Sequence, residues 1–275
     1  MTARATWHEL DVAAGGVRLH VRRLEMMAPP LLLLHGLGVS GAVWQAFARR
    51  LAPHWSAIAP DLRGHGSSDR PPHGYEPVDY ARDVAALLTA VGVEQAPAVG
   101  HSLGALVALA LASLEPERLP ALVLLDPPLD PRREHPDVPA VYRLRHAPAG
   151  ELERFLARNG TPALVARSMA ALFRQAADAA FEAHLAAPRG APWAWQAAER
   201  IRQPVLLLQA DPAHGGVLGD VAAQAFVARL PQGRLVKLPG APHALHASHP
   251  AQVARAIVAF LQPFSRGSSA GGTPR

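Results

Sequence analysis

The chain contains no cysteine. Structural disulfides, thiolate nucleophiles and cysteine-ligated zinc are therefore excluded. Lysine is nearly absent too, since Lys237 is the only one, and arginine carries almost all of the positive charge. The formal net charge is +5, but the arginines are scattered among acids and no run of basic residues forms a stripe. We expect a solvated basic surface and no nucleic-acid partner.

Targeting and membrane-spanning signals are also lacking. The first residues, MTARATWHELDV, contain no apolar segment and carry Glu9 and Asp11, so we expect neither a secretory signal nor a transit peptide. Residues 96–114 have no charged side chain and nearly the length of a membrane span, but the polar stretch GHSLG interrupts them. We expect a cytoplasmic protein without a membrane span, in which this segment belongs to the core.

Short apolar runs alternate with amphipathic segments along most of the chain. With 49% hydrophobic residues, 275 residues can bury a large core. The runs are apolar enough to be buried on both faces, as the strands of parallel sheets usually are. The predicted strands are Leu31 to Leu34, Ser56 to Ala59, Ala96 to Val99, Ala121 to Leu125, Val205 to Leu208 and Arg234 to Leu238. The alternation predicts an α/β fold with a mostly parallel central sheet flanked by helices.

Helical periodicity and turn signals predict the structure of the segments outside these strands. Apolar residues at helical spacing run from Tyr80 to Val91 and from Val253 to Leu261. The first 25 residues differ, because two runs flank the turn-forming sequence AAGG at 13–16. This arrangement predicts an antiparallel hairpin that leads into the sheet.

The regular alternation stops after Asp126 and resumes at Val205. Between them we find no convincing strand, but helix boundary signals such as Thr161-Pro162 are frequent. Three or four helices inserted between two strands of the sheet fit this pattern. The predicted organisation is a core of residues 1–130 and 203–262, a helical cap insertion at 131–202 and a disordered Gly/Ser-rich tail at 263–275.

One polar pentapeptide interrupts the apolar run at 96–114. Residues 100–104, GHSLG, follow a predicted strand and precede a predicted helix. In that context G-x-S-x-G forms a turn so tight that the serine adopts a strained backbone conformation and only small residues fit two positions to either side. The turn holds the hydroxyl of Ser102 above the carboxyl edge of the sheet. Ser102 is therefore the candidate nucleophile, and it needs a base and an oxyanion site.

Three further segments accompany this turn. Residues 31–38, LLLLHGLG, resemble the oxyanion loop of the α/β-hydrolase fold family, and residues 61–68, DLRGHGSS, resemble its D-x-R-G-x-G-x-S turn. Residues 239–243, PGAPH, resemble the segment that delivers the catalytic histidine in this family. With four motifs in the right order, the chain is identified as a member of the α/β-hydrolase fold family, apart from the insertion. The resemblance implies the α/β-hydrolase fold with a helical cap.

The resemblance also implies roles for a histidine and a carboxylate. His243 would be the base, in the chain order Ser, acid, His that the fold requires. Two carboxylates could orient its imidazole, since Asp126 ends one predicted strand and Asp211 follows another at the same edge of the sheet. The resemblance favours Asp211, with Asp126 as the alternative.

The remaining site predictions concern the oxyanion and nearby histidines. The resemblance implies that the backbone N–H groups of Leu37 and Leu103 hold the oxyanion. His246 and His249 repeat the spacing of His243, but no nearby carboxylate completes a metal ligand set, so no metal or other cofactor is expected.

Several conspicuous polar residues receive structural interpretations. His35 and His101 flank catalytic backbone, and we expect them to pack or to hydrogen-bond locally. Asp61 and Arg63 are expected to fix the loop that contains them.

Together these features predict a serine hydrolase. Its substrate would be a small carboxylic ester or lactone with an apolar acyl or alkoxy group, cleaved through an acyl-enzyme intermediate. Alternatives are hydrolysis of a carbon–carbon bond in β-diketone-like substrates, perhydrolase activity, and ligand binding without catalysis on the same fold. Serine at the elbow argues against haloalkane dehalogenase and epoxide hydrolase chemistry, which need a carboxylate nucleophile. The sequence does not predict the oligomeric state.

Overall fold

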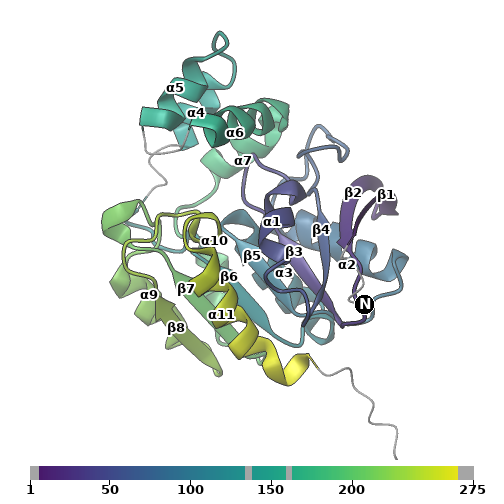
Figure 1. Ribbon diagram of the computed structural model, residues 1–275. Helices are drawn as coiled ribbons and strands as arrows, with labels where there is room; N and C mark the ends of the chain where they lie inside the picture. The colour runs from purple at the N-terminus through teal and green to yellow at the C-terminus, as the bar shows by residue number, and fades with distance from the viewer. Residues whose placement is uncertain (1–5, 134–137, 159–162, 266–275) are drawn as a thin grey trace, which may run out of the picture.

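The computed structural model describes residues 6–133, 138–158 and 163–265. Its strands are β1 (Trp7–Ala14), β2 (Val17–Leu24), β3 (Pro30–Leu34), β4 (Ser56–Pro60), β5 (Ala98–His101), β6 (Leu122–Leu125), β7 (Val205–Gln209) and β8 (Gly233–Lys237). They form one sheet in the order β1-β2-β4-β3-β5-β6-β7-β8 (Figure 1). The strands from β3 to β8 pair in parallel, whereas β2 pairs antiparallel with both β1 and β4. The predicted mostly parallel sheet is confirmed.

All six predicted strands are present, and the predicted hairpin is β1 and β2. Ala14 pairs with Val17, and Gly15 and Gly16 between them have positive φ angles of 60° and 93°. Glycine adopts such angles without a Cβ penalty. The largest shift is in β5, which begins two residues later than predicted and extends through His101 to the elbow.

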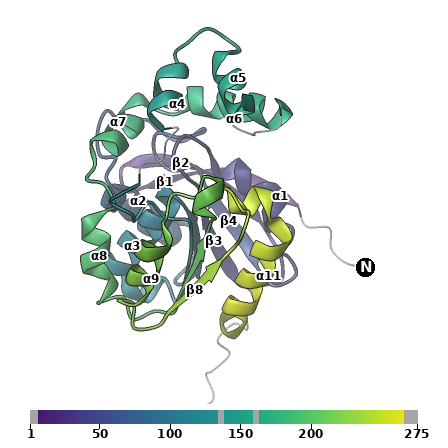
Figure 2. The ribbon, with the colours of Figure 1, turned by 90° about the vertical axis from the view of Figure 1, so that its left-hand side faces the viewer.

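Helices cover both faces of the sheet (Figure 2). The helices outside the insertion are α1 (Gln45–Ala48), α2 (Pro77–Ala90), α3 (Leu103–Leu114), α9 (Asp220–Val227), α10 (Leu245–Ser248) and α11 (Pro250–Leu261), with 3-10 turns at Gly41–Trp44, Pro116–Arg118, Pro212–His214 and Gln262–Phe264. Side chains of each strand alternate between two hydrophobic clusters. Leu32 and Leu34 of β3 pack with α2, α3 and α9, whereas Leu31 and Leu33 pack with α1 and α11.

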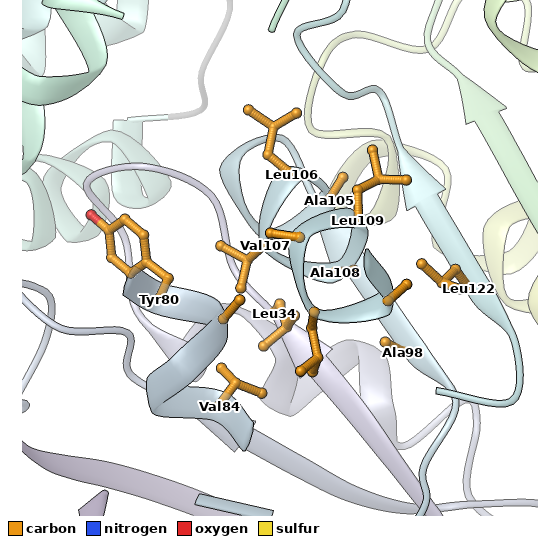
Figure 3. Close-up of a cluster of buried hydrophobic side chains, with 14 of the residues drawn as sticks. Leu34, Tyr80, Val84, Ala98, Ala105, Leu106, Val107, Ala108, Leu109 and Leu122 are labelled. Atoms are coloured by element: carbon orange, nitrogen blue, oxygen red, sulfur yellow. The ribbon is translucent and has the colours of Figure 1, made fainter. Parts of the chain in front are cut away.

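The first of these clusters surrounds α3, as Figure 3 shows. Leu34, Val84 and Val107 contribute to it from β3, α2 and α3. The helix α3 is almost wholly apolar because its surroundings are, but it has only 12 residues. No helix in the part of the chain that the structure describes is long and apolar enough to cross a membrane. Residues 96–112 are buried in the core, as predicted, whereas Ser113 and Leu114 are exposed.

The described part of the insertion contains five helices, where three or four were expected. They are α4 (Val138–Leu144), α5 (Glu151–Arg158), α6 (Ala163–Gln175), α7 (Asp178–Ala186) and α8 (Pro192–Ala198). In Figure 1, α4, α5 and α6 lie beyond one edge of the sheet, and together with α7 they have a small hydrophobic cluster of their own. The helix α8 differs, because Ala194 and Ala198 pack into the core cluster around α3.

Some sequence predictions fall outside the described residues. These are the boundary signal Thr161-Pro162 and most of the predicted tail, residues 266–275. The division of the chain into a core and a separate cap stays a prediction.

Candidate active site

Ser102 lies at the turn between β5 and α3. Its φ of 53° and ψ of −114° are strained for a residue with a side chain. Gly100 and Gly104, two positions to either side, explain how the turn is tolerated. A Cβ at Gly100 would overlap the carbonyl of Gly104, and a Cβ at Gly104 would overlap the carbonyl oxygen of Leu34. The predicted elbow geometry is confirmed.

The loop after β3 packs directly on this turn. A Cβ added to Gly36 would lie 3.4 Å from Cβ of Ser102 and 3.0 Å from Nδ1 of His101. The loop therefore brings Leu37 beside the elbow, while Leu103 is the first residue of α3. The first amides of a helix have no intrahelical acceptor, and the helix dipole favours negative charge there. Within the described ranges, neither the Leu37 nor the Leu103 amide donates to a protein acceptor.

His243 is hydrogen-bonded to a carboxylate that follows β6. Its Nδ1 lies 2.7 Å from Oδ2 of Asp126, which is fully buried. The same Oδ2 accepts a hydrogen bond of 2.9 Å from the amide of Val217, and Oδ1 accepts one of 3.4 Å from the amide of Ala210. Asp126 has a positive φ of 43°, unusual for aspartate. These contacts fix the carboxylate under the imidazole.

The prediction that Asp211 orients His243 is corrected by this geometry. Asp211 Oδ2 accepts a hydrogen bond of 2.8 Å from the amide of Gly240, and Oδ1 accepts one of 3.0 Å from the amide of Ala213. These two bonds lower the pKa of Asp211 to about 2, and His214, at 3.1 Å, adds to the effect. Asp211 therefore holds the backbone of the loop that carries His243, not the imidazole itself.

A sequence signal for this role was present. In Asp211-Pro212-Ala213 an aspartate precedes a proline, the pattern of a helix N-cap followed by proline at the first helical position. The carboxylate of Asp211 does cap the short 3-10 turn that begins at Pro212.

His101 has a role that the sequence reasoning missed. Its Nε2 donates a hydrogen bond of 3.1 Å to the backbone carbonyl of His243. The His101 ring lies 4.6 Å from that of His243 and 4.7 Å from that of His246, which in turn lies 4.6 Å from the Trp44 ring. His101 therefore packs and hydrogen-bonds as expected, but with residues distant in the chain, and it ties the loop of His243 to the residue next to Ser102.

Burial dominates the electrostatics of the imidazole. It lowers the pKa of His243 to about 3, and the nearby histidines His246 and His184 act in the same direction. The carboxylate of Asp126 opposes this, because an adjacent negative charge favours the imidazolium form. The ring is therefore neutral at pH 7 and can accept a proton.

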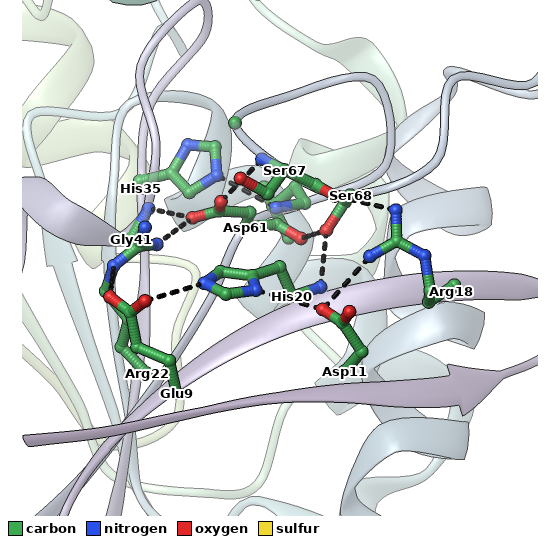
Figure 4. Close-up of polar contacts among 12 residues, drawn as sticks. Glu9, Asp11, Arg18, His20, Arg22, His35, Gly41, Asp61, Ser67 and Ser68 are labelled. Carbon is green, nitrogen blue, oxygen red and sulfur yellow. Dashed lines mark hydrogen bonds and ion pairs between the residues drawn. The ribbon is translucent and has the colours of Figure 1, made fainter.

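The loop at 61–68 is a structural support for the site (Figure 4). Asp61 is fully buried and accepts hydrogen bonds from the amides of Gly41 (2.8 Å) and Ser67 (2.9 Å) and from the guanidinium of Arg22 (2.6 Å). His35 accepts a hydrogen bond of 2.9 Å from the Leu62 amide. The expected structural roles of Asp61 and His35 are confirmed. Nowhere in the described ranges are three His, Cys, Asp or Glu side chains arranged to hold a metal ion.

The amino-acid sequence matches one known protein family. The family described as alpha/beta hydrolase fold matches residues 29–198. The chain belongs to this family. The pimeloyl-[acyl-carrier protein] methyl ester esterase of Aromatoleum aromaticum is 33% identical over 247 residues, which cover 82% of this chain and 95% of that protein.

Solved structures of other α/β-hydrolases resemble the whole fold. An esterase from Exiguobacterium antarcticum matches with a TM-score of 0.79 at 16% identity, covering 93% of this chain and 100% of that one. E-2-(acetamidomethylene)succinate hydrolase matches with a TM-score of 0.77 at 27% identity, covering 94% of this chain and 100% of that one. Other curated relatives are matched over less than half their length, for example 36% of a Mycobacterium tuberculosis protein.

Proposed function

We propose that this protein is a serine hydrolase that cleaves a carboxylic ester or lactone through an acyl-enzyme intermediate. The observation that carries the proposal is the hydrogen bond between His243 and the buried Asp126, in a loop tied by His101 to the strained turn of Ser102. A nucleophile, a base and an orienting acid are the groups that acyl transfer by serine requires.

Each group has a defined task in this mechanism. Asp126 accepts a hydrogen bond from Nδ1–H of His243, which leaves Nε2 as the basic nitrogen. Nε2 takes the proton of Ser102 as its Oγ attacks the carbonyl carbon, and Asp126 stabilises the imidazolium that forms. Collapse of the tetrahedral intermediate expels the alcohol, which receives the proton from His243. Water, activated by the same nitrogen, then releases the acid.

The oxyanion of both tetrahedral intermediates would lie between the amides of Leu37 and Leu103. Among the residues that the structure describes, neither amide has a protein acceptor, and one of them begins a helix. Preorganised donors of this kind act most strongly where water is excluded.

The surroundings of the oxyanion loop favour an apolar substrate group. A Cβ at Gly38 would overlap the rings of Phe173 and Phe181, so these two side chains from α6 and α7 lie directly over the loop. The relatives favour the same reaction class, since they include a methyl ester esterase and, at a TM-score of 0.76, the enol-lactonase of Burkholderia xenovorans.

The nucleophile assignment is tested by replacing Ser102 with alanine. We expect loss of hydrolysis of short-chain 4-nitrophenyl esters and loss of labelling by an organophosphonate, with an unchanged circular dichroism spectrum. The matched control is Ser113→Ala, because Ser113 lies near the other end of the helix that follows Ser102 and bonds only the carbonyl of Leu109. Normal turnover by a folded Ser102→Ala protein would refute the proposal. An unmodified wild-type protein after treatment with the phosphonate would favour ligand binding without catalysis.

A further inference from the structure

A cavity of about 230 Å³ lies beside the elbow. Its walls come from α2, α3 and α7 and from the chain before α8, and they include the buried side chains of Leu103 and Leu106 of α3. Leu103 is the residue whose amide we assign to the oxyanion. Among the described residues that line the cavity, none belongs to the loop that carries His243. The cavity therefore adjoins Leu103, the residue after Ser102, and not the loop that carries His243.

This position decides which half of a substrate the cavity can hold. The departing alcohol must reach Nε2 of His243 to receive its proton, so it lies on the side of the histidine loop. The acyl chain then extends away from that loop, toward Leu103 and the cavity. A volume of about 230 Å³ suits a short chain, since it lies below the range typical of drug-sized ligand pockets.

Most polar side chains of the wall are already engaged. The Tyr75 hydroxyl donates a hydrogen bond of 2.6 Å to the carbonyl of Pro71, and Glu76 caps the first turn of α2. Arg133 donates a hydrogen bond of 3.0 Å to the carbonyl of Pro212 and is exposed, as is Arg189. The two arginines therefore belong to the solvent-facing rim.

Three polar side chains of the wall have no hydrogen-bond partner among the described residues: Tyr80, His184 and Trp193. The indole of Trp193 can only donate, whereas the other two can also accept. Tyr80 is buried, and Figure 3 shows its hydroxyl pointing away from the apolar cluster in which its ring packs. Burial lowers the pKa of His184, so at pH 7 its imidazole is neutral and offers one donor and one acceptor. His184 is half-buried. A hydroxyl and a neutral imidazole that line a cavity without protein partners can hydrogen-bond a ligand placed there.

His184 also connects the cavity to the catalytic groups. It lies close enough to His243 to lower the pKa of that imidazole.

We propose that this cavity binds the acyl chain of the substrate and that Tyr80 and His184 hydrogen-bond an uncharged polar group on it, such as a ketone, an amide or a hydroxyl. The proposal rests on the proposed function and adds the substrate class. A carboxylate fits less well, because both interior groups are neutral and a buried carboxylate needs a charged partner.

Three ethyl esters of similar length test this selectivity: ethyl pentanoate, ethyl 4-oxopentanoate and monoethyl succinate. They end in an alkyl group, a ketone and a carboxylate, and their hydrolysis is followed by pH-stat titration. We expect kcat/KM for the ketone to exceed that for each of the other two esters by about 10-fold or more, because a site built to hydrogen-bond discriminates against an analogue that lacks the group.

Variants assign the selectivity to the two side chains. Tyr80→Phe and His184→Leu should each reduce the ratio of kcat/KM for ethyl 4-oxopentanoate over ethyl pentanoate by about threefold or more. The matched control is Tyr75→Phe. The Tyr75 hydroxyl donates to the carbonyl of Pro71, so its removal should leave the ratio unchanged. Two substitutions at different positions keep the test valid if one variant does not fold.

The outcomes separate this inference from the proposed function. Hydrolysis of ethyl pentanoate without a preference for the ketone, or a preference that survives both substitutions, would overturn the inference and leave the esterase proposal standing. Fastest hydrolysis of monoethyl succinate would also overturn it, in favour of anion binding by the rim arginines. Failure to hydrolyse any ester would remove both proposals.

Discussion

His243 and Asp126 are joined by a hydrogen bond of 2.7 Å across 117 positions of the chain. The carboxylate is fully buried and also accepts hydrogen bonds from two backbone amides, so it has little freedom to turn toward another partner. The acid at this site therefore follows β6, while the carboxylate that follows β7 supports the histidine loop.

Replacing each aspartate with asparagine distinguishes the role of Asp126 from that of Asp211. We expect Asp126→Asn to lower kcat for a short-chain ester by roughly 10³- to 10⁴-fold, because the imidazole loses both its tautomer control and its counter-charge. Asp211→Asn should cost about 10-fold or less, since it weakens contacts to the backbone of Gly240 and Ala213 and to the side chain of His214, and none of these is the imidazole of His243. Equal losses, or a larger loss at Asp211, would contradict the assignment of the acid.

His101 should act as a positioning residue for His243. Its Nε2 holds the carbonyl of His243, so loss of that donor lets the base move relative to Ser102. We expect His101→Leu to lower kcat on the order of 100-fold with little change in KM, as small displacements of catalytic groups do. His101→Gln places an N–H donor near the same position and should recover much of the loss. A purely structural role predicts equal defects in both variants, together with a lower melting temperature.

Gly104 should be essential for folding of the elbow. A Cβ there overlaps the carbonyl oxygen of Leu34, and neither backbone segment can give way without disturbing β3 or α3. We expect Gly104→Ala to lower the free energy of unfolding by about 3 kcal/mol or more in urea titrations.

The control for this substitution is Gly92→Ala. Gly92 has a φ of +70° but no atom within 4 Å of an added Cβ, so alanine there costs only the backbone strain of about 1–2 kcal/mol. A similar loss in both variants would mean that the overlap at Gly104 is relieved by small movements.

Stability should fall in mild acid because of buried neutral histidines. Burial lowers the pKa of His35 to about 4 and that of His65 to about 3, whereas an unperturbed histidine titrates near pH 6.5. Between about pH 6.5 and about pH 4 the unfolded chain binds protons that the folded protein does not, so the free energy of unfolding decreases as the pH falls. Each group contributes a slope of up to about 1.4 kcal/mol per pH unit.

Urea unfolding at about pH 7.5 and about pH 5 measures this slope. His35→Gln keeps an acceptor for the Leu62 amide but cannot titrate, so it should make the pH dependence shallower. An unchanged slope in this variant would exclude His35 as a source of the acid sensitivity.

The sheet and the elbow could be predicted from the sequence because both follow from local patterns. Buried parallel strands are short apolar runs, and the turn at Ser102 needs glycine at 100 and 104 whatever surrounds it. The position of α8 could not be predicted in this way. Its apolar spacing is the same whether the helix packs on other inserted helices or, as Ala194 and Ala198 do, on the core around α3.

Local sequence patterns did not show which aspartate orients His243, for a different reason. β6 and β7 are neighbours in the sheet, so Asp126 and Asp211 reach the same edge. The positive φ of Asp126 contributes to aiming its carboxylate at His243, and no residue type in the sequence marks that backbone angle. The amides of Gly240 and Ala213 occupy Asp211 instead.

The presence of carboxylates after both strands has an evolutionary consequence. A chain that lost Asp126 would still have the carboxylate of Asp211 after the neighbouring strand. That carboxylate could turn to the imidazole only by giving up the amides of Gly240 and Ala213, so transfer of the acid from one strand to the other would also require the histidine loop to change.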